Sequence, residues 1–202
     1  MTAQQPVTRL PTPQTRGQHS LEELIAARRS VRSYGSAPMT LPQLSQILWS
    51  AQGTTSADGK RSVPSAGARY PLELYVAATR VAGLQPGVYR FVTKDHSLAR
   101  VSTSDVAACL VKAAGDQNML AQAAVVLVFV AAPARSTRYG ARAARFIAIE
   151  VGAAMQDVYL QATSLGLGTV AVGTVEEPQV RRCVPLGVDE AALLMMPVGP
   201  RQ

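Results

Sequence analysis

A long helical segment near the middle of the chain constrains the fold most. Between residues 142 and 165, apolar or small residues recur every three or four positions, which is the spacing of one broad helical face. Glu150 and Asp157 are too costly in hydrocarbon for this segment to cross a membrane. The sequence therefore predicts a long helix buried in a globular core.

Small residues form a stripe on that predicted helix. Ala144, Ala148 and Gly152 are each four residues apart, and a glycine in a helix interior costs about 1 kcal/mol relative to alanine. A stripe of this kind admits a close neighbour. We expect that neighbour to be another element of the fold or the same helix of a second copy.

The composition describes a globular protein whose basic excess suits either an anionic ligand or solubility alone. The chain has 202 residues with 48% hydrophobic and 16% charged, which favours one domain with a substantial core. The net charge is +7, and 17 of the 20 basic residues are Arg, which suits bidentate contact with phosphate or carboxylate. No run of Lys and Arg is interleaved with aromatic residues, so we expect no nucleic-acid partner.

The cysteines, histidines and apolar runs bear on the compartment. Cys109 and Cys183 lie far apart in apolar segments, so we interpret them as buried thiols and not as a disulfide. Neither histidine has a Cys or an acid at ligand spacing, and we expect no metal site. The N-terminus lacks a basic-then-apolar signal, and the longest apolar run, residues 123–134, is too short to span a bilayer. These features predict a cytoplasmic protein without a membrane partner.

The pattern along the chain predicts an α+β fold. Residues 1–19, rich in Pro and Gln, are interpreted as a flexible arm or one that wraps a partner, and residues 20–202 as the folded domain. Helices are expected to begin at Ser20, Thr40 and Ser104 and around Glu176. Strands are expected over 72–79, 88–92, 124–132, 169–173 and 192–199, in a mostly antiparallel sheet flanked by helices.

The first candidate site is a basic cluster at a helix-to-loop junction. Three guanidinium groups and a hydroxyl occur within five residues and could hold a terminal phosphate; they are Arg28, Arg29, Ser30 and Arg32. A solvated basic helix end would explain the same residues.

The second candidate is a loop of small residues, Pro64 to Ala68. Its backbone could lie flat against a planar ligand, although a plain turn before a strand would look the same. Residues 166–171 also match the pattern G-x-G-x-x-A, but they follow a helix and precede a strand, the reverse of a dinucleotide-binding turn. We therefore interpret Gly166 as a helix C-cap.

Taken in order, these segments resemble the nitroreductase family of FMN-dependent oxidoreductases over about residues 20–200. The resemblance is carried by ARRSVRSY, VPSAGARYPLELYVA, GVYRF, the stretch RYGARAARFIAIEVGAAMQDVYLQATSLGLGTVAVG and the ending LLMMPVG. PSAGARYPLELYV and PGVYRF are most similar to the SagB-type dehydrogenase branch, which includes flavin oxidases that convert azolines to azoles in peptides.

The resemblance implies an intertwined homodimer with FMN in two clefts at the subunit interface and the stripe of small residues packed between the copies. It also implies a ping-pong reaction in which NAD(P)H delivers hydride to FMN, and a small electron-poor acceptor, such as a nitroaromatic or a quinone, takes the electrons. By similarity, the FMN phosphate and ribityl chain would be held by the basic cluster, Arg28, Arg29, Ser30 and Arg32. The flavin ring would lie against a loop of the partner subunit, formed by Pro64, Ser65, Ala66 and Gly67. Val172 and Gly173 would lie near the N5 edge of the ring.

Three places depart from the family pattern. Many relatives have Asn where this loop reads AGA, so hydrogen bonds to the ring would come from the backbone. Many have a longer C-terminal tail, and here only Arg201 could bring a basic residue to the phosphate. Arg138 and Tyr139 stand where azoline-oxidising relatives have a Lys-Tyr pair that handles protons.

These departures decide which function is expected. Arginine has a pKa above about 12 and cannot act as a base, so Arg138 favours a small-molecule reductase. A peptide azoline oxidase is the first alternative. A non-enzymatic basic domain that binds a polyanion is the second.

Overall fold

The computed structural model describes residues 7–202, and its centre is a seven-stranded sheet in which every pairing is antiparallel. The strand order is β1-β6-β5-β3-β7-β9-β8. The strands are β1 (Val7–Arg9), β3 (Leu72–Ala78), β5 (Gly87–Val92), β6 (Ser97–Ser102), β7 (Val125–Ala131), β8 (Leu167–Thr169) and β9 (Ala191–Pro200), and a separate short parallel pair consists of β2 (Met39–Thr40) and β4 (Val81–Ala82). The predicted α+β fold with an antiparallel sheet is confirmed.

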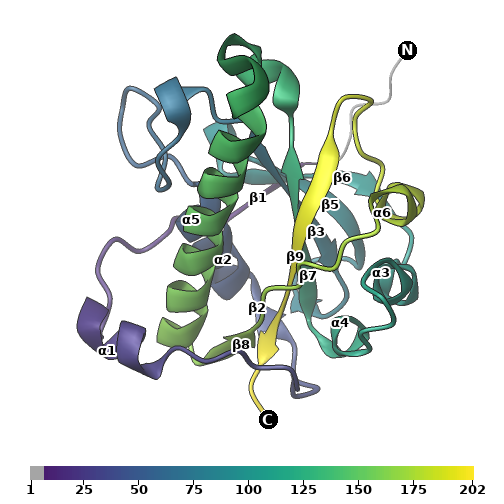
Figure 1. Ribbon diagram of the computed structural model, residues 1–202. Helices are drawn as coiled ribbons and strands as arrows, with labels where there is room; N and C mark the ends of the chain where they lie inside the picture. Colours follow the sequence, from purple (N-terminus) through teal and green to yellow (C-terminus); the bar gives the residue numbers. More distant parts are fainter. Residues whose placement is uncertain (1–6) are drawn as a thin grey trace.

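Helices cover both faces of the sheet (Figure 1). On one face lie α1 (Leu21–Ala27), α2 (Leu41–Gln52) and α5 (Ala143–Ser164), and on the other lie α3 (Ala107–Ala113), α4 (Met119–Gln122) and α6 (Glu177–Cys183). Three short 3-10 helices complete the fold: η1 (Ala66–Ala68), η2 (Thr93–Asp95) and η3 (Pro133–Arg142). Every residue of β7 is buried, as an apolar strand covered on both faces should be.

Three helix ends are set by capping residues as predicted. Ser20 and Thr40 each form a capping box, with Glu23 and Gln43 respectively. Gly166 has a positive φ of 69° just after α5, which an L-residue with a side chain rarely adopts.

Two predicted boundaries were wrong. α3 begins at Ala107 and not at Ser104, because the Asp105 carboxylate accepts the Ala107 N–H at 3.0 Å. The short strand lies at Leu167–Thr169 and not at 169–173, because these residues pair with the end of β9.

Part of the predicted flexible arm, residues 7–14, contacts the body of the domain. Its residues 1–6 lie outside the described residues, but β1 pairs with β6, and Leu10 is buried. The Gln14 N–H donates to the Gln46 side-chain oxygen at 2.8 Å, and that side chain donates back to the Gln14 carbonyl. Backbone bonding to a sheet edge does not depend on side-chain type, which is why the polar composition did not reveal it.

The interpretation of the cysteines as free thiols was also wrong. Cys109 of α3 and Cys183 of α6 form a disulfide, with Cα atoms 5.8 Å apart. α3 and α6 pack side by side (Figure 1), which brings together residues 74 positions apart. Sequence spacing alone could not show this contact.

Reducing this disulfide is expected to lower the free energy of unfolding by about 2–4 kcal/mol, since it closes a long loop in the unfolded chain. Urea unfolding with and without reductant measures the change. The Cys109→Ser/Cys183→Ser variant is the control and should not respond to reductant. An unchanged urea midpoint for the reduced wild type would contradict a stabilising role.

α5 buries one face and exposes the other. The buried face includes Ile147, Ala154 and Val158, whereas Ile149 on the opposite side is 62% exposed. A Cβ added at Gly152 would meet no atom within 4 Å. No other described element therefore packs on the stripe of small residues at Gly152. Within residues 7–202, no helix is long and apolar enough to cross a bilayer.

Candidate active site

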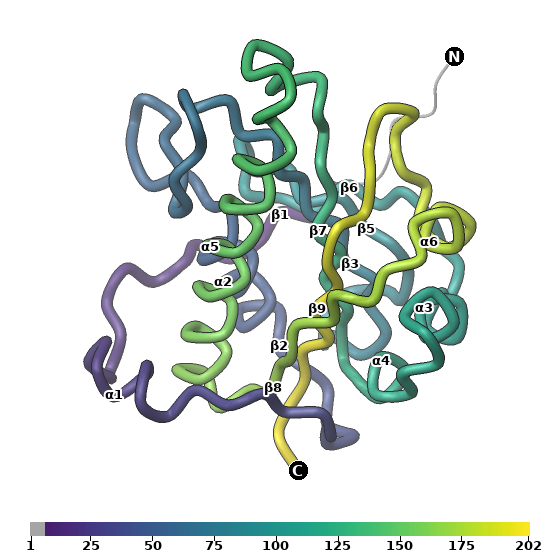
Figure 2. Tube along the Cα trace, viewed as in Figure 1, coloured from purple at the N-terminus to yellow at the C-terminus, as the bar shows by residue number. Residues whose placement is uncertain are grey.

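The predicted site residues fall into two groups at opposite ends of α5. Figure 2 shows residues 28–34 and β8 at the C-terminal end of this helix, and residues 54–70 with η3 at its N-terminal end. Each group brings together segments that are distant in the sequence. We describe them in turn as the basic group and the loop group.

The basic group is built on a close contact between residues 28–32 and β8. The Val31 N–H donates to the Thr169 carbonyl at 2.9 Å. A Cβ at Gly168 would collide with the Val31 side chain, so only glycine allows this approach. The Arg201 side chain adds a hydrogen bond to the Leu167 carbonyl at 3.1 Å. The chain end is thereby joined to the basic cluster.

Tyr159 of α5 connects this cluster to the segment after β8. Its hydroxyl lies 3.2 Å from Ser30 Oγ and accepts the Ala171 N–H at 2.7 Å. The Arg28 guanidinium lies over its ring, 5.0 Å from the ring centre. Arg28, Ser30 and Ala171 therefore converge on one side chain that the sequence analysis missed. Its apolar helical surroundings gave no signal of this role.

The arginines of the cluster differ in what their side chains do. The Arg29 guanidinium donates to the carbonyls of Ala26 and Arg28 at 2.9 and 2.7 Å, and so caps the end of α1. Arg32 is exposed. Arg29 thus matches the alternative of a helix-end cation, whereas Arg28 and Arg32 are available to a ligand.

Val172 and Gly173 lie just beyond Ala171. Val172 exchanges two backbone hydrogen bonds with Met195 of β9, at 2.8 and 3.1 Å, which fixes this segment. Gly173 is exposed, and a Cβ built on it would meet nothing within 4 Å. A ligand can therefore approach its backbone closely.

The loop group joins the Pro64–Gly67 loop to η3. Gly67 has a φ of 58°, and a Cβ there would collide with the Tyr139 hydroxyl. The same position lies 3.8 Å from Nη1 of Arg138. The structure therefore brings Arg138 and Tyr139 against the small-residue loop, about 70 residues earlier in the chain, and the positive φ of Gly67 favours glycine there.

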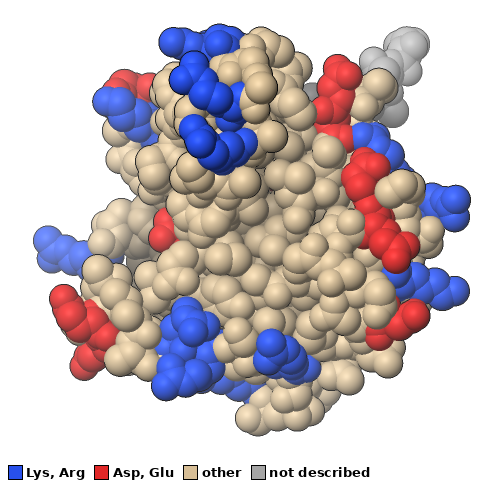
Figure 3. Space-filling view, in the orientation of Figure 1, with Lys and Arg blue, Asp and Glu red and all other residues tan. Residues whose placement is uncertain are grey.

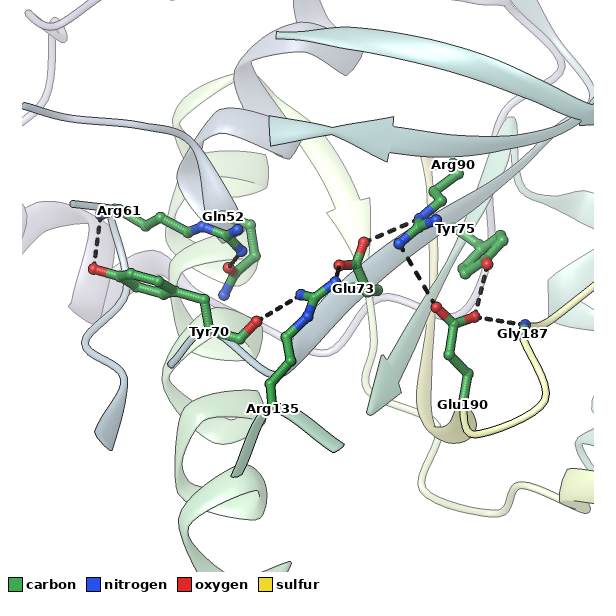
Figure 4. Close-up of polar contacts among 9 residues, drawn as sticks. All are labelled: Gln52, Arg61, Tyr70, Glu73, Tyr75, Arg90, Arg135, Gly187 and Glu190. Atoms are coloured by element: carbon green, nitrogen blue, oxygen red, sulfur yellow. Dashed lines mark hydrogen bonds and ion pairs between the residues drawn. The ribbon is translucent and has the colours of Figure 1, made fainter. Parts of the chain in front are cut away.

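Arg135 fastens η3 to this loop (Figure 4). Its guanidinium donates to the Tyr70 carbonyl at 2.8 Å and pairs with Glu73, and its own carbonyl accepts from Arg69 Nε at 3.0 Å. Glu73 also pairs with Arg90 at 3.1 Å. Because the Glu73 side chain is only 11% exposed, these contacts are better shielded from solvent than a surface ion pair.

The network continues to the start of β9 (Figure 4). Arg90 lies 3.7 Å from Glu190, which accepts the Tyr75 hydroxyl at 2.7 Å. Burial and this hydrogen bond raise the pKa of Tyr75 above its ordinary value, so the phenol stays protonated. The sequence analysis missed this network, because residues from β3, β5, η3 and the β9 end meet only in three dimensions.

The other side of the loop is held by a second polar cluster. Arg61 donates to the Gln52 side-chain oxygen at 2.7 Å and stacks on the Tyr70 ring, 4.6 Å from its centre. Ser65 Oγ accepts the Tyr70 N–H at 2.8 Å. Burial raises the pKa of Glu150, which is 2% exposed, and hydrogen bonding to Ser65 opposes that rise. The loop is thus fixed from both sides before any ligand binds.

One cavity reaches the edge of the loop group at Thr55 and Ser62. It measures about 750 Å³ and lies between the arm, α2 and the C-terminal half of α5, with Trp49, Asp157 and Leu160 among its walls. None of the site residues predicted from the sequence lines it. Burial raises the pKa of Asp157 to about 6.

Asp157→Asn is expected to raise the free energy of unfolding by about 1–2 kcal/mol at pH 8, with the pKa shift discounted for partial exposure. A carboxyl whose folded pKa is raised costs stability above that pKa, and this cost disappears below the unfolded pKa of about 4. Urea unfolding of both proteins at pH 4 and pH 8 provides the measurement. A difference that is the same at both pH values would rule out this cause.

The basic side chains on the surface also gather in two places. Figure 3 shows one collection of blue side chains over η3 and the start of α5, another below α1 and β8, and an uncharged face between them. The exposed arginines of the first are Arg138, Arg142 and Arg145, and those of the second are Arg29, Arg32 and Arg201. The uncharged face includes the exposed side of α5.

The comparisons with known proteins support a flavin-dependent oxidoreductase as the general class of this chain. Residues 25–200 match the nitroreductase family, and the chain belongs to that family. The match to an enzyme family supports an enzyme over the alternative of a non-enzymatic polyanion-binding domain.

Individual relatives agree with this assignment. A Methanocaldococcus jannaschii protein assigned as a nitroreductase is 47% identical over 180 residues, which cover 89% of this chain and 90% of the relative. A solved structure from Ralstonia eutropha JMP134, assigned likewise, has a TM-score of 0.87 at 29% identity and covers 100% of this chain and 92% of its own. The NADPH:FMN oxidoreductase of Vibrio harveyi, solved with NAD+, shares the fold, with a TM-score of 0.66 at 22% identity over 90% of this chain and 68% of its own.

Proposed function

We propose that the protein uses bound FMN to transfer hydride from NAD(P)H to a small electron-poor acceptor in a ping-pong reaction. The observation that carries this proposal is the convergence of Arg28, Ser30 and the segment leading to Gly173 around Tyr159. The Arg28 guanidinium, the Ser30 hydroxyl and the segment that leads to the open backbone of Gly173 thus all contact one side chain. That is the arrangement that a phosphorylated planar cofactor requires.

The residues present fit FMN. Arg28, Arg32 and the Ser30 hydroxyl supply the charge-assisted hydrogen bonds that a phosphate dianion accepts. Gly173 leaves room for a ring system, since nothing lies within 4 Å of its Cβ position. Arg201 is joined to the same cluster through Leu167 and would add positive charge.

We infer that a second copy of the chain completes each site. The loop group lies at the start of α5, at Ala143, and the basic group contacts Tyr159 near the other end of the helix. These two positions are sixteen residues apart, which is about 24 Å along the helix axis. Antiparallel packing of α5 against α5 of a second copy would bring the loop group of one chain to the basic group of the other. The outer face of α5 beyond Arg145, with Ile149 exposed and Gly152 open, suits that contact.

The residues around the cleft would orient the reactants. Bound FMN supplies hydride acceptance and donation. The loop from Pro64 to Gly67, fixed by Arg135 and by the polar cluster at Arg61, would keep the ring plane in position. Arg138 and Arg28 would stabilise negative charge on the reduced cofactor and on its phosphate.

A SagB-type azoline oxidase acting on a peptide is the second candidate. It is favoured by the Tyr139 hydroxyl, which lies against Gly67 where it could meet a substrate proton. Arg138 disfavours it, because a guanidinium group cannot accept that proton. A reductase should therefore lose little activity on Tyr139→Phe, whereas an azoline oxidase should lose nearly all.

We propose the cytoplasm as the compartment, since NAD(P)H is the expected donor. The Cys109–Cys183 disulfide weighs against this assignment, because reducing compartments disfavour such bonds.

The visible spectrum of the purified protein tests the proposal. The protein should be yellow, release FMN and not FAD on heating, and lose its flavin colour when NAD(P)H is added without oxygen. An acceptor such as a quinone should restore the colour. A two-dalton loss from an azoline peptide without NAD(P)H turnover would favour the oxidase, and a colourless protein that does not take up FMN would contradict both.

A further inference from the structure

Two arginines beside the loop group are held on aromatic rings. The Arg138 guanidinium lies 5.2 Å from the ring centre of Tyr139, and the Arg145 guanidinium lies 5.7 Å from that of Phe146. The two rings contact each other edge to face at 5.0 Å. The four side chains form one array, which we call the arginine–aromatic array.

The array has unused positive charge. Among residues 7–202, neither Arg138 nor Arg145 has a carboxylate within 4.0 Å, whereas Arg90, Arg135 and Arg181 are all paired. Both arginines are exposed. Stacking on a ring leaves the N–H groups at the edge of a guanidinium plane available for an anion.

The array also adjoins the proposed redox centre. Arg138 Nη1 is 3.8 Å from the Cβ position of Gly67, in the loop proposed to flank the flavin ring. Arg135, three residues earlier in η3, is fixed to Glu73 and to the Tyr70 carbonyl. Because η3 is firmly attached, the backbone of Arg138 is held next to the Pro64–Gly67 loop.

We propose that Arg138 and Arg145 form an anion subsite that binds the phosphate groups of the reduced nicotinamide donor. The inference rests on the proposed function and adds the recognition of its donor. A phosphate accepts the forked hydrogen bonds of a guanidinium group. A site with two such groups next to the flavin would attract the dinucleotide and hold its nicotinamide near the ring.

The phosphate could be the 2′-phosphate of NADPH or the pyrophosphate that NADH and NADPH share. If the array binds the 2′-phosphate, neutralising it should weaken NADPH selectively and lower the NADPH/NADH preference. If it binds the pyrophosphate, both donors should weaken equally. Either pattern supports an anion subsite and identifies which phosphate it takes.

The test uses the oxidised holoenzyme and its Arg138→Gln and Arg145→Gln variants. Calorimetric titration with NADP+ and with NAD+ gives binding constants that do not depend on turnover. Each variant should raise the dissociation constant for NADP+ about 5- to 20-fold at low salt, and the effect should shrink at 0.5 M salt because the site is exposed. Arg145→Lys, which keeps the charge, should lose less than Arg145→Gln.

Arg182→Gln is the matched control, because Arg182 is exposed on α6 across the sheet. It should leave both dissociation constants unchanged. Unchanged nucleotide binding in both array variants, or an equal change in Arg182→Gln, would overturn the subsite while leaving the FMN reductase intact. A wild-type protein without flavin would instead overturn the proposed function.

Discussion

The Arg28→Ala/Arg32→Ala double variant is expected to bind FMN at least about 100-fold more weakly than the wild type. Each charge-assisted hydrogen bond to a phosphate contributes about 1.5–3 kcal/mol, so each single variant should weaken FMN about 10- to 100-fold. Titration of the apoprotein, followed by quenching of flavin fluorescence, measures the dissociation constants directly.

Arg29→Ala is the matched control for this experiment. Its guanidinium is occupied by the Ala26 and Arg28 carbonyls, so its removal should change FMN affinity less than about threefold. Affinity that is lost in Arg29→Ala but kept in the double variant would contradict the assignment of Arg28 and Arg32 to the phosphate.

Gly152→Leu is expected to convert the protein to a monomer and to remove most of its flavin. Within one chain the new side chain would project into open space, and leucine favours a helix over glycine, so the fold of the monomer should persist. In a dimer packed through α5, the same side chain would overfill the contact. Sedimentation and the ratio of absorbance at 450 nm to that at 280 nm report the two losses.

Gly152→Ala serves as the control because it adds one methyl group to the same position. It should remain dimeric and yellow and unfold at a similar or higher temperature. A Gly152→Leu protein that stays dimeric with full flavin content would show that the stripe of small residues is not the interface.

Local chemistry explains which parts of the fold could be predicted from the sequence. The capping boxes at Ser20 and Thr40 predict the starts of two helices, and the apolar run in β7 predicts a central strand. Both signals can be recognised because they depend only on residues close together in the sequence. The attachment of β1 depends on backbone hydrogen bonds to β6. The disulfide depends on the packing of α3 against α6. Neither leaves a trace in the local pattern.

The same distinction between local and long-range signals applies to the candidate site. The segments at Arg28–Arg32 and Pro64–Gly67 carry dense local signals, so the sequence and its family resemblance predict them as site residues. Tyr159 and Arg135 were not, because each sits in an ordinary context and acquires its role only from partners far away in the chain.

The central claim is that each FMN site is shared between two copies, and mixing two defective variants tests it most directly. One variant carries Arg28→Ala and Arg32→Ala, and the other carries Gly67→Val, which should displace the loop against Tyr139. Each alone should be nearly colourless. After the variants are unfolded together and refolded with FMN, half of the dimers should be mixed, and each of these has one intact site. The account predicts recovery of about one quarter of the wild-type flavin content. Mixed dimers that form but recover no flavin would contradict it.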